Sequence, residues 1–123
     1  MSLDELNQRV TNAIIRAEGL PAGSQEAWEA FHDMSALEES ITMLVPPDDL
    51  EGEIARLGAV TAALSAGEPL RALQLAERFL AESLAPEIAE KLRQFVKEAD
   101  AELGRAASNE PIVTPVTFTL GAA

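Results

Sequence analysis

Apolar residues recur at alternating spacings of three and four through most of the chain, which is the period of an amphipathic α-helix. Gly and Pro residues interrupt this pattern and divide it into segments. The pattern predicts five helices, over about residues 3–18, 24–45, 48–66, 69–84 and 86–103. Because the breaks between the later helices are only two or three residues long, we expect antiparallel neighbours. The predicted fold is therefore all-α, a single five-helix antiparallel bundle.

Capping signals accompany these helices. Ser2 and Glu5 have the spacing of a capping box at the first helix, and Asp48 and Glu51 have it at the third, while Ser24 is suited to cap the second. Pro favours the first turn of a helix and Gly favours its C-terminal end. The residues that fit these two roles are Pro69, Pro86, Gly19, Gly67 and Gly104.

Each predicted helix carries one apolar stripe that we expect to face the core. The stripes of the second, third and fourth helices are Phe31, Met34, Leu37, Ile41 and Val45; Leu50, Ile54, Leu57, Thr61 and Leu64; and Leu70, Leu73, Ala76, Phe79 and Leu80.

The segment from Leu57 to Pro86 resembles a tetratricopeptide helix pair. Leu57-Gly58, the small residues Ala72 and Ala76, and a Pro after the second helix stand at suitable places. The resemblance implies helical-hairpin packing of the tetratricopeptide type. The first-helix aromatics of that repeat are missing here, and no second copy follows, whereas a solenoid needs about three repeats.

The C-terminal residues break with the helical pattern and divide the chain into a helical domain (1–104), a linker (105–111) and an extended apolar tail (112–123). The tail alternates like a strand, with apolar side chains facing one way and Thr the other. An isolated strand has no neighbour for its backbone N–H and C=O groups. We therefore expect this β-like arm to bind a partner, to swap onto a sister subunit, or to remain disordered. Its candidate partner-binding residues are Ile112, Val113, Val116, Phe118 and Leu120.

Two further interpretations of the tail stay open. The sequence Phe118-Thr119-Leu120-Gly121-Ala122 resembles the C-terminal cargo-loading peptides of encapsulin cargo proteins, which implies a cargo-targeting tail. Alternatively, the helical part is a leader and the apolar tail is the core peptide of a modified precursor.

The net charge of −12 is unevenly distributed. Ala17 to Ala55 contains ten Asp and Glu residues and no Lys or Arg. Such a field repels nucleic acid and anionic membranes and attracts a basic protein surface, although it is also typical of a solvated helix face. The chain has no Cys, no basic and apolar signal segment at its N-terminus and no apolar run long enough for a membrane span. We expect a soluble, cytoplasmic protein.

Few residues are candidates for metal binding or for a buried polar site. Glu29 and His32 have the Glu-x-x-His spacing of di-iron carboxylate bundles, but His32 is the only His, and the helical period turns both side chains away from the apolar stripe. We expect His32 on the surface, with metal binding as an alternative. Glu38 falls within the apolar stripe, so we expect it to pair with an Arg such as Arg71 or Arg78, or to serve as a buried polar anchor.

Trp28 lies at the edge of the same stripe, as a core residue or an interface anchor. No nucleophile and base stand together, and no cofactor motif is present. The sequence therefore predicts a non-catalytic protein-interaction module, such as an adaptor, small chaperone or assembly subunit, that needs no cofactor and can form homo-oligomers. The alternative is a metal-binding, iron-handling oligomeric bundle.

Overall fold

The computed structural model describes residues 1–109, with side chains through residue 107, and contains five α-helices within them. They are α1 (Leu3–Glu18), α2 (Gln25–Thr42), α3 (Leu50–Ser65), α4 (Pro69–Leu80) and α5 (Pro86–Asn109). No β-strand occurs in that range. The predicted all-α fold with five helices is confirmed. The predicted tail residues, Ile112, Val113, Val116, Phe118 and Leu120, lie outside the described part of the chain.

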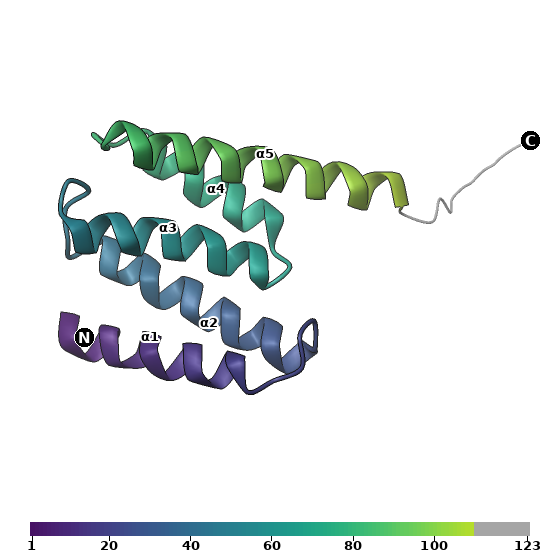
Figure 1. Ribbon diagram of the computed structural model, residues 1–123, viewed down its shortest axis with the longest axis horizontal. Helices are drawn as coiled ribbons and strands as arrows, with labels where there is room; N and C mark the ends of the chain where they lie inside the picture. The colour runs from purple at the N-terminus through teal and green to yellow at the C-terminus, as the bar shows by residue number, and fades with distance from the viewer. Residues whose placement is uncertain (110–123) are drawn as a thin grey trace, which may run out of the picture.

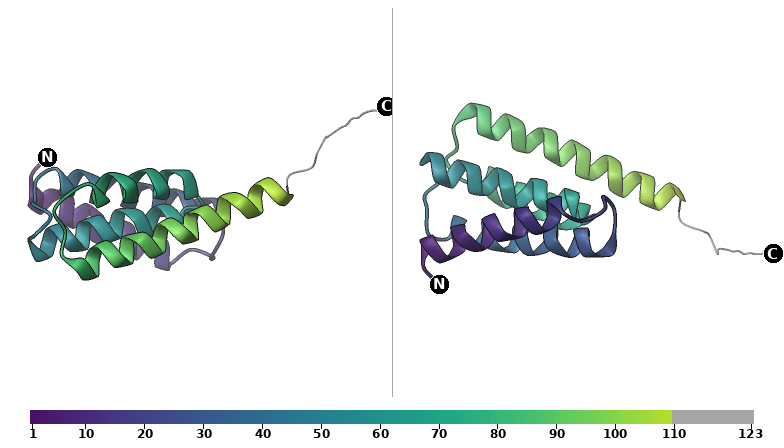
Figure 2. Two further views of the ribbon diagram at one scale, coloured as in Figure 1. Left: turned by 90° about the horizontal axis from the view of Figure 1, so that it is seen from above. Right: turned by 60° about the horizontal axis from the view of Figure 1, so that its bottom comes forward.

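Consecutive helices run antiparallel and pack side by side in the order of the sequence, from α1 to α5 (Figure 1). The central helix α3 contacts α2 on one side and α4 and α5 on the other. The longest helix, α5, extends beyond the other four, so the N-terminus and the end of α5 lie at opposite ends of the molecule (Figure 2). Within residues 1–109 there is no helix of the length and apolar character that crossing a membrane requires.

The capping predictions are partly confirmed. Ser2 and Glu5 form the expected box: Ser2 Oγ accepts a hydrogen bond from the Glu5 N–H at 3.2 Å, and the Ser2 N–H donates to Glu5 Oε1 at 2.9 Å. The box predicted at Asp48 is wrong, because α3 begins one residue later and its N-cap, Asp49, makes no side-chain cap bond. Pro69 and Pro86 both occupy the first turn of their helices, as predicted.

Three predicted helix ends are wrong. The fourth helix, α4, ends at Leu80, four residues before the predicted residue 84. Gly104 does not stop α5, which continues to Asn109, so residues 105–109 of the predicted linker are helical. Among the described residues only Gly23 and Gly67 have positive φ angles, and Gly104 keeps a conformation that any residue adopts in a helix. The second helix ends at Thr42, three residues before the predicted Val45.

The core consists of two apolar clusters that share α3. One joins α3, α4 and α5, and the other joins α1, α2 and the start of α3. The prediction that Leu50 and Ile54 face the core is wrong, since they are 69% and 57% exposed, and Leu70 is exposed as well. Because α3 is packed on opposite sides, it buries small residues that allow close approach of its neighbours. Its buried residues are Gly52, Ala55, Arg56, Ala59, Val60, Ala62 and Ala63.

A buried arginine joins three segments at one end of the bundle. Arg56 is 2% exposed, and its Nε and Nη2 atoms donate to the two carboxylate oxygens of Glu82 at 2.7 and 3.1 Å. Its remaining N–H groups donate to backbone carbonyls at the end of α2, in the connection that follows it and in α3, at 3.0–3.3 Å. The five donors of the guanidinium are thus all bonded, which is the condition for burying this charge without a large penalty. The accepting carbonyls are those of Thr42, Val45 and Gly52.

Candidate functional site

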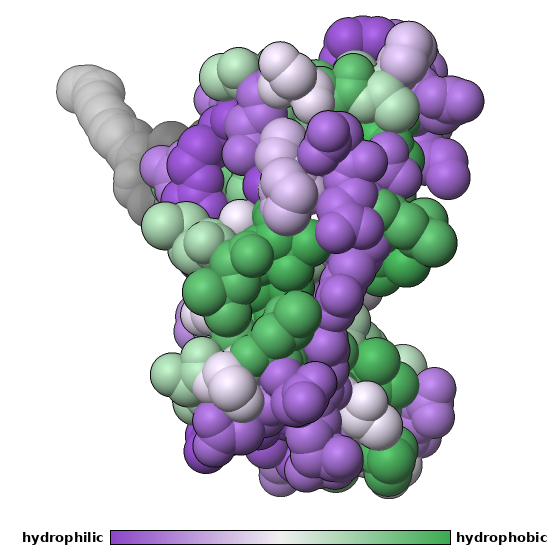
Figure 3. Space-filling model, turned by 90° about the vertical axis from the view of Figure 1, so that its left-hand side faces the viewer, coloured by the Kyte–Doolittle hydropathy of each residue, from purple (hydrophilic) through white to green (hydrophobic). Residues whose placement is uncertain are grey.

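Large apolar side chains are exposed at the end of the molecule where α1 begins and α2 connects to α3. We call Met1, Met43, Leu44, Leu50 and Ile54 the apolar end; all five are more than half exposed, Met43 to 78%. A shallow cavity of about 350 Å³ opens between α1 and α2 at this end, with Leu6 and Leu37 among its lining residues. Figure 3 shows apolar side chains gathered on this face between polar ones.

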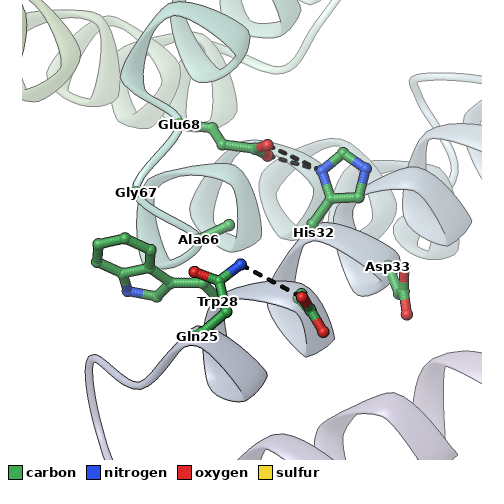
Figure 4. Close-up of a pocket in the computed structure, with 8 residues that line it drawn as sticks. Gln25, Trp28, His32, Asp33, Ala66, Gly67 and Glu68 are labelled. Atoms are coloured by element: carbon green, nitrogen blue, oxygen red, sulfur yellow. Dashed lines mark hydrogen bonds and ion pairs between the residues drawn. The ribbon is translucent and has the colours of Figure 1, made fainter.

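A second hollow of about 430 Å³ lies between the first half of α2 and the turn that joins α3 to α4. We call it the Trp28 groove. The α2 residues enter it from one side, and the turn residues close the other (Figure 4). Its lining residues are Gln25, Trp28, Glu29, His32, Asp33, Ala66, Gly67 and Glu68.

The turn at Gly67 positions the indole ring of Trp28. Gly67 has φ +72°, which ends α3 in the left-handed conformation that favours glycine. A Cβ on Gly67 would lie 3.5–3.6 Å from three atoms of the Trp28 ring, Cε2, Cζ2 and Cδ2. Near-equal distances to these atoms place the glycine over the face of the ring. The turn therefore covers part of the indole, while Trp28 stays 44% exposed.

The polar lining residues of the Trp28 groove are hydrogen-bonded, and one of these contacts crosses the groove. His32 Nδ1 lies 2.9 Å from both carboxylate oxygens of Glu68, and Glu29 accepts a hydrogen bond from Gln25 at 3.2 Å (Figure 4). Asp33 points away from this pair and bonds Arg16 of α1 at 3.0 Å. The surface position predicted for His32 is confirmed, since the residue is exposed.

Glu29 and His32 do not form a metal site together with other side chains of the described residues. No group of three or more His, Cys, Asp or Glu side chains stands close enough to hold a metal ion within residues 1–107. Glu29 faces Gln25 along its own helix, and His32 faces Glu68 across the groove. The two side chains of the predicted motif thus have different partners.

Glu38 is buried, but the arginine partners predicted for it are wrong. Arg71 and Arg78 instead bond the two oxygens of the neighbouring Glu39, each at 2.9 Å. Glu38 is 8% exposed and lies against Gly58 of α3, where the absent side chain leaves room for its carboxylate. Burial raises the pKa of Glu38 to about 7, because removal from water penalises the charged form.

The pKa of Glu39 is shifted in the opposite direction from that of Glu38. Burial acts to raise the pKa of Glu39, but hydrogen bonds from Arg71 and Arg78 and their positive charges outweigh it and hold that pKa below its ordinary value. Arg71 also donates to Ser35 Oγ at 3.1 Å, and Ser35 donates to the carbonyl of Ala59 at 2.7 Å. A polar network therefore joins α2, α3 and α4 beside the buried Glu38.

Sequence reasoning named Trp28 and Glu29 but missed the other wall of the groove. Gly67 and Glu68 come from the turn that follows α3, more than thirty residues further along the chain. The one local signal was Gly67 itself, because a glycine at a helix end marks a left-handed turn. The apolar end was missed because Leu50 and Ile54 continue the apolar stripe of α3 and were therefore assigned to the core.

Comparisons of the chain with protein-family models, curated proteins and solved structures found no significant match.

Proposed function

We propose that this protein is a non-catalytic interaction module that binds a partner protein through its helical body and its C-terminal tail. The observation that carries this proposal is the apolar end, where five large side chains are each more than half exposed. Scattered single apolar residues are normal on a protein surface, but large ones gathered at one end of a small domain are typical of a contact surface. Two of the five are Met, whose flexible side chain suits adaptable interfaces.

The charge distribution supports a basic partner. The stretch from Ala17 to Ala55 has no Lys or Arg and covers α2, the connection to α3 and the start of α3. Its exposed acidic residues include Glu26, Glu29, Asp48 and Asp49. A field of one sign raises the rate of encounter with a surface of the other sign and suppresses wrong partners.

In this proposal the tail supplies a second contact. Its alternate residues Val116, Phe118 and Leu120 enter apolar pockets of the partner, while main-chain hydrogen bonds fix the register, as in strand addition to a sheet edge. Each large side chain buried in this way contributes about 1.5–3 kcal/mol before the cost of ordering the tail.

The test is a binding experiment with three altered forms of the full protein. Partners captured from the native organism are identified, purified and titrated against the wild type, Ile54→Ser, Phe118→Ala and the chain ending at Asn109. We expect each altered form to bind at least tenfold more weakly, with unchanged helicity and melting temperature, because none removes a buried side chain of the described core. Gln8→Ser, an exposed polar position on α1, is the control and should bind normally.

Partners that bind all three altered forms as tightly as the wild type would refute the proposal. If only the tail variants lose binding, the tail alone is the contact and the role given to the apolar end is wrong. If the shortened chain unfolds, the tail belongs to the core and is not a docking arm.

A further inference from the structure

We infer that the Trp28 groove receives an arginine side chain of the partner, with its guanidinium stacked on the open part of the indole and its N–H groups donating to carboxylates of the groove. This inference rests on the proposed function, because it assumes that a basic protein binds the acidic half of the chain. It adds a specific recognition site to the general attraction of the acidic field.

The aromatic surface is the first requirement for such a site, and it is held in place. The turn at Gly67, whose positive φ favours glycine, lies over one face of the indole, because a Cβ built there would be 3.5–3.6 Å from three atoms of the ring. The other part of the ring remains in water, since Trp28 is 44% exposed. A flat cation over an indole face is attracted by the negative potential of the ring, and Trp is the best aromatic side chain for this contact.

The carboxylates beside the ring are the second requirement. Glu29 follows Trp28 in the sequence and lines the same groove, and Glu68 forms its opposite wall. None of the groove's lining residues is a Lys or Arg. Arg16 of α1 bonds the lining residue Asp33, and His32 Nδ1 lies against both oxygens of Glu68. A guanidinium that enters the groove therefore meets carboxylate acceptors on both walls and no Lys or Arg of the lining.

Arginine fits this combination better than lysine or an apolar side chain. Its planar guanidinium stacks on an aromatic ring and still directs N–H groups toward acceptors at its edge, whereas an ammonium is a compact and strongly hydrated charge. An apolar side chain would offer no donor to the acceptor positions of Glu29 and Glu68 that Gln25 and His32 leave unused, and it would displace the water there. An anionic side chain would be repelled by them.

The test uses the intact protein and three capped hexapeptides, of arginine, of lysine and of citrulline, which is the uncharged analogue of arginine. The chain contains one Trp, so a proton–nitrogen NMR spectrum shows one indole N–H signal, which belongs to Trp28. We expect hexa-arginine to shift this signal in a saturable manner, hexa-lysine to bind at least threefold more weakly, and hexa-citrulline to leave it in place. An unmoved indole signal with hexa-arginine, or equal affinities for arginine and lysine, would overturn the inference.

Calorimetric titration of variants then locates the site. Trp28→Leu should weaken hexa-arginine binding by about tenfold and Glu29→Gln by about threefold, in line with the usual strength of cation–π contacts and exposed ion pairs. Glu26→Gln is the matched control, because it removes the same charge from the same helix at a residue that does not line the Trp28 groove. Its affinity should stay within twofold of the wild type.

Equal losses for Glu26→Gln and Glu29→Gln would mean that the acidic field alone attracts the peptide, and the site would be rejected. Experiments can refute the arginine site without refuting the proposed interaction module. A natural partner that binds Trp28→Leu as tightly as the wild type, yet loses affinity for Ile54→Ser, overturns the arginine site and leaves the interaction module standing.

Discussion

Replacing Glu38 by Gln should stabilise the protein above neutral pH, although the substitution removes a charge from a very acidic chain. Glu38 is 8% exposed and lies against Gly58, and burial raises its pKa to about 7 from the ordinary 4.5. Its carboxyl group is therefore protonated in the folded protein at pH values where it is ionised in the unfolded chain. Gln has nearly the same shape and stays uncharged at every pH, so it avoids the cost of a buried charge.

The sign and size follow from linkage between folding and proton binding. Since the folded pKa is the higher one, the fold holds the proton more tightly, and its contribution to stability is complete below the unfolded pKa. That contribution is lost as the pH rises toward 7. A difference of 2.5 between about 7 and 4.5 corresponds to about 3 kcal/mol over the whole range, of which about 2 kcal/mol falls between pH 5.5 and 8.5.

The assay is urea unfolding of the wild type and Glu38→Gln at several pH values from 5.5 to 8.5, followed by circular dichroism and by the fluorescence of Trp28. The other acidic residues titrate alike in both proteins, so their contributions cancel in the difference of unfolding free energies. We expect this difference to grow in favour of the Gln variant by about 2 kcal/mol across the range. Parallel curves for the two proteins would refute the reasoning.

Glu39→Gln is the matched control, because it makes the same substitution at the adjacent residue. The hydrogen bonds from Arg71 and Arg78 stabilise the ionised form of Glu39 and lower its pKa, in spite of partial burial. Its substitution should therefore destabilise the protein at pH 8.5, opposite in sign to Glu38→Gln. Stabilisation by both substitutions would show that relief of net negative charge, and not burial of Glu38, is the cause.

Two further predictions concern the packing of α3 and α5 and are tested by urea unfolding. Gly52→Ala should destabilise the protein by about 2 kcal/mol or more, as at other overpacked sites, because the new Cβ would overlap the carbonyl oxygen of Pro46. Gly104 lies in open space, so Gly104→Ala should stabilise the protein by about 0.5–1 kcal/mol. Equal effects of the two substitutions would contradict the close approach of Pro46 to Gly52. Arg56→Met should cost about 3–5 kcal/mol, because it leaves Glu82 and three backbone carbonyls without their donor; a loss below 1 kcal/mol would show that the network contributes little.

The helices could be predicted from the sequence because their signals are local. Apolar spacing, the Ser2–Glu5 box and the prolines at the start of α4 and α5 each act within one or two turns. The buried face of α3 could not be predicted in the same way. Periodicity weights large apolar residues, but a helix packed on opposite sides buries small ones such as Ala59 and Ala63 and leaves Leu50 in water.

Arg56 shows why some features of the fold could not be predicted from local sequence patterns. An arginine in a helix is normally assigned to the surface, and burial becomes possible only when acceptors from separate segments surround it. Those acceptors lie at the end of α2 and just after it, within α3 and after α4. No spacing rule connects them, because their proximity is a consequence of the packed bundle.

The Trp28 groove also depends on the packing of distant segments. Its recognition of an arginine side chain therefore has a physical basis beyond net charge. Any strongly acidic helix attracts a basic protein, and salt weakens such attraction at exposed positions. The Trp28 groove adds an aromatic face that is covered on one side by a turn from a distant part of the chain, since Gly67 lies over the ring. Ordering the indole before the partner arrives reduces the entropy lost on binding. Discrimination between arginine and lysine should therefore persist at salt concentrations that abolish the response to net charge alone.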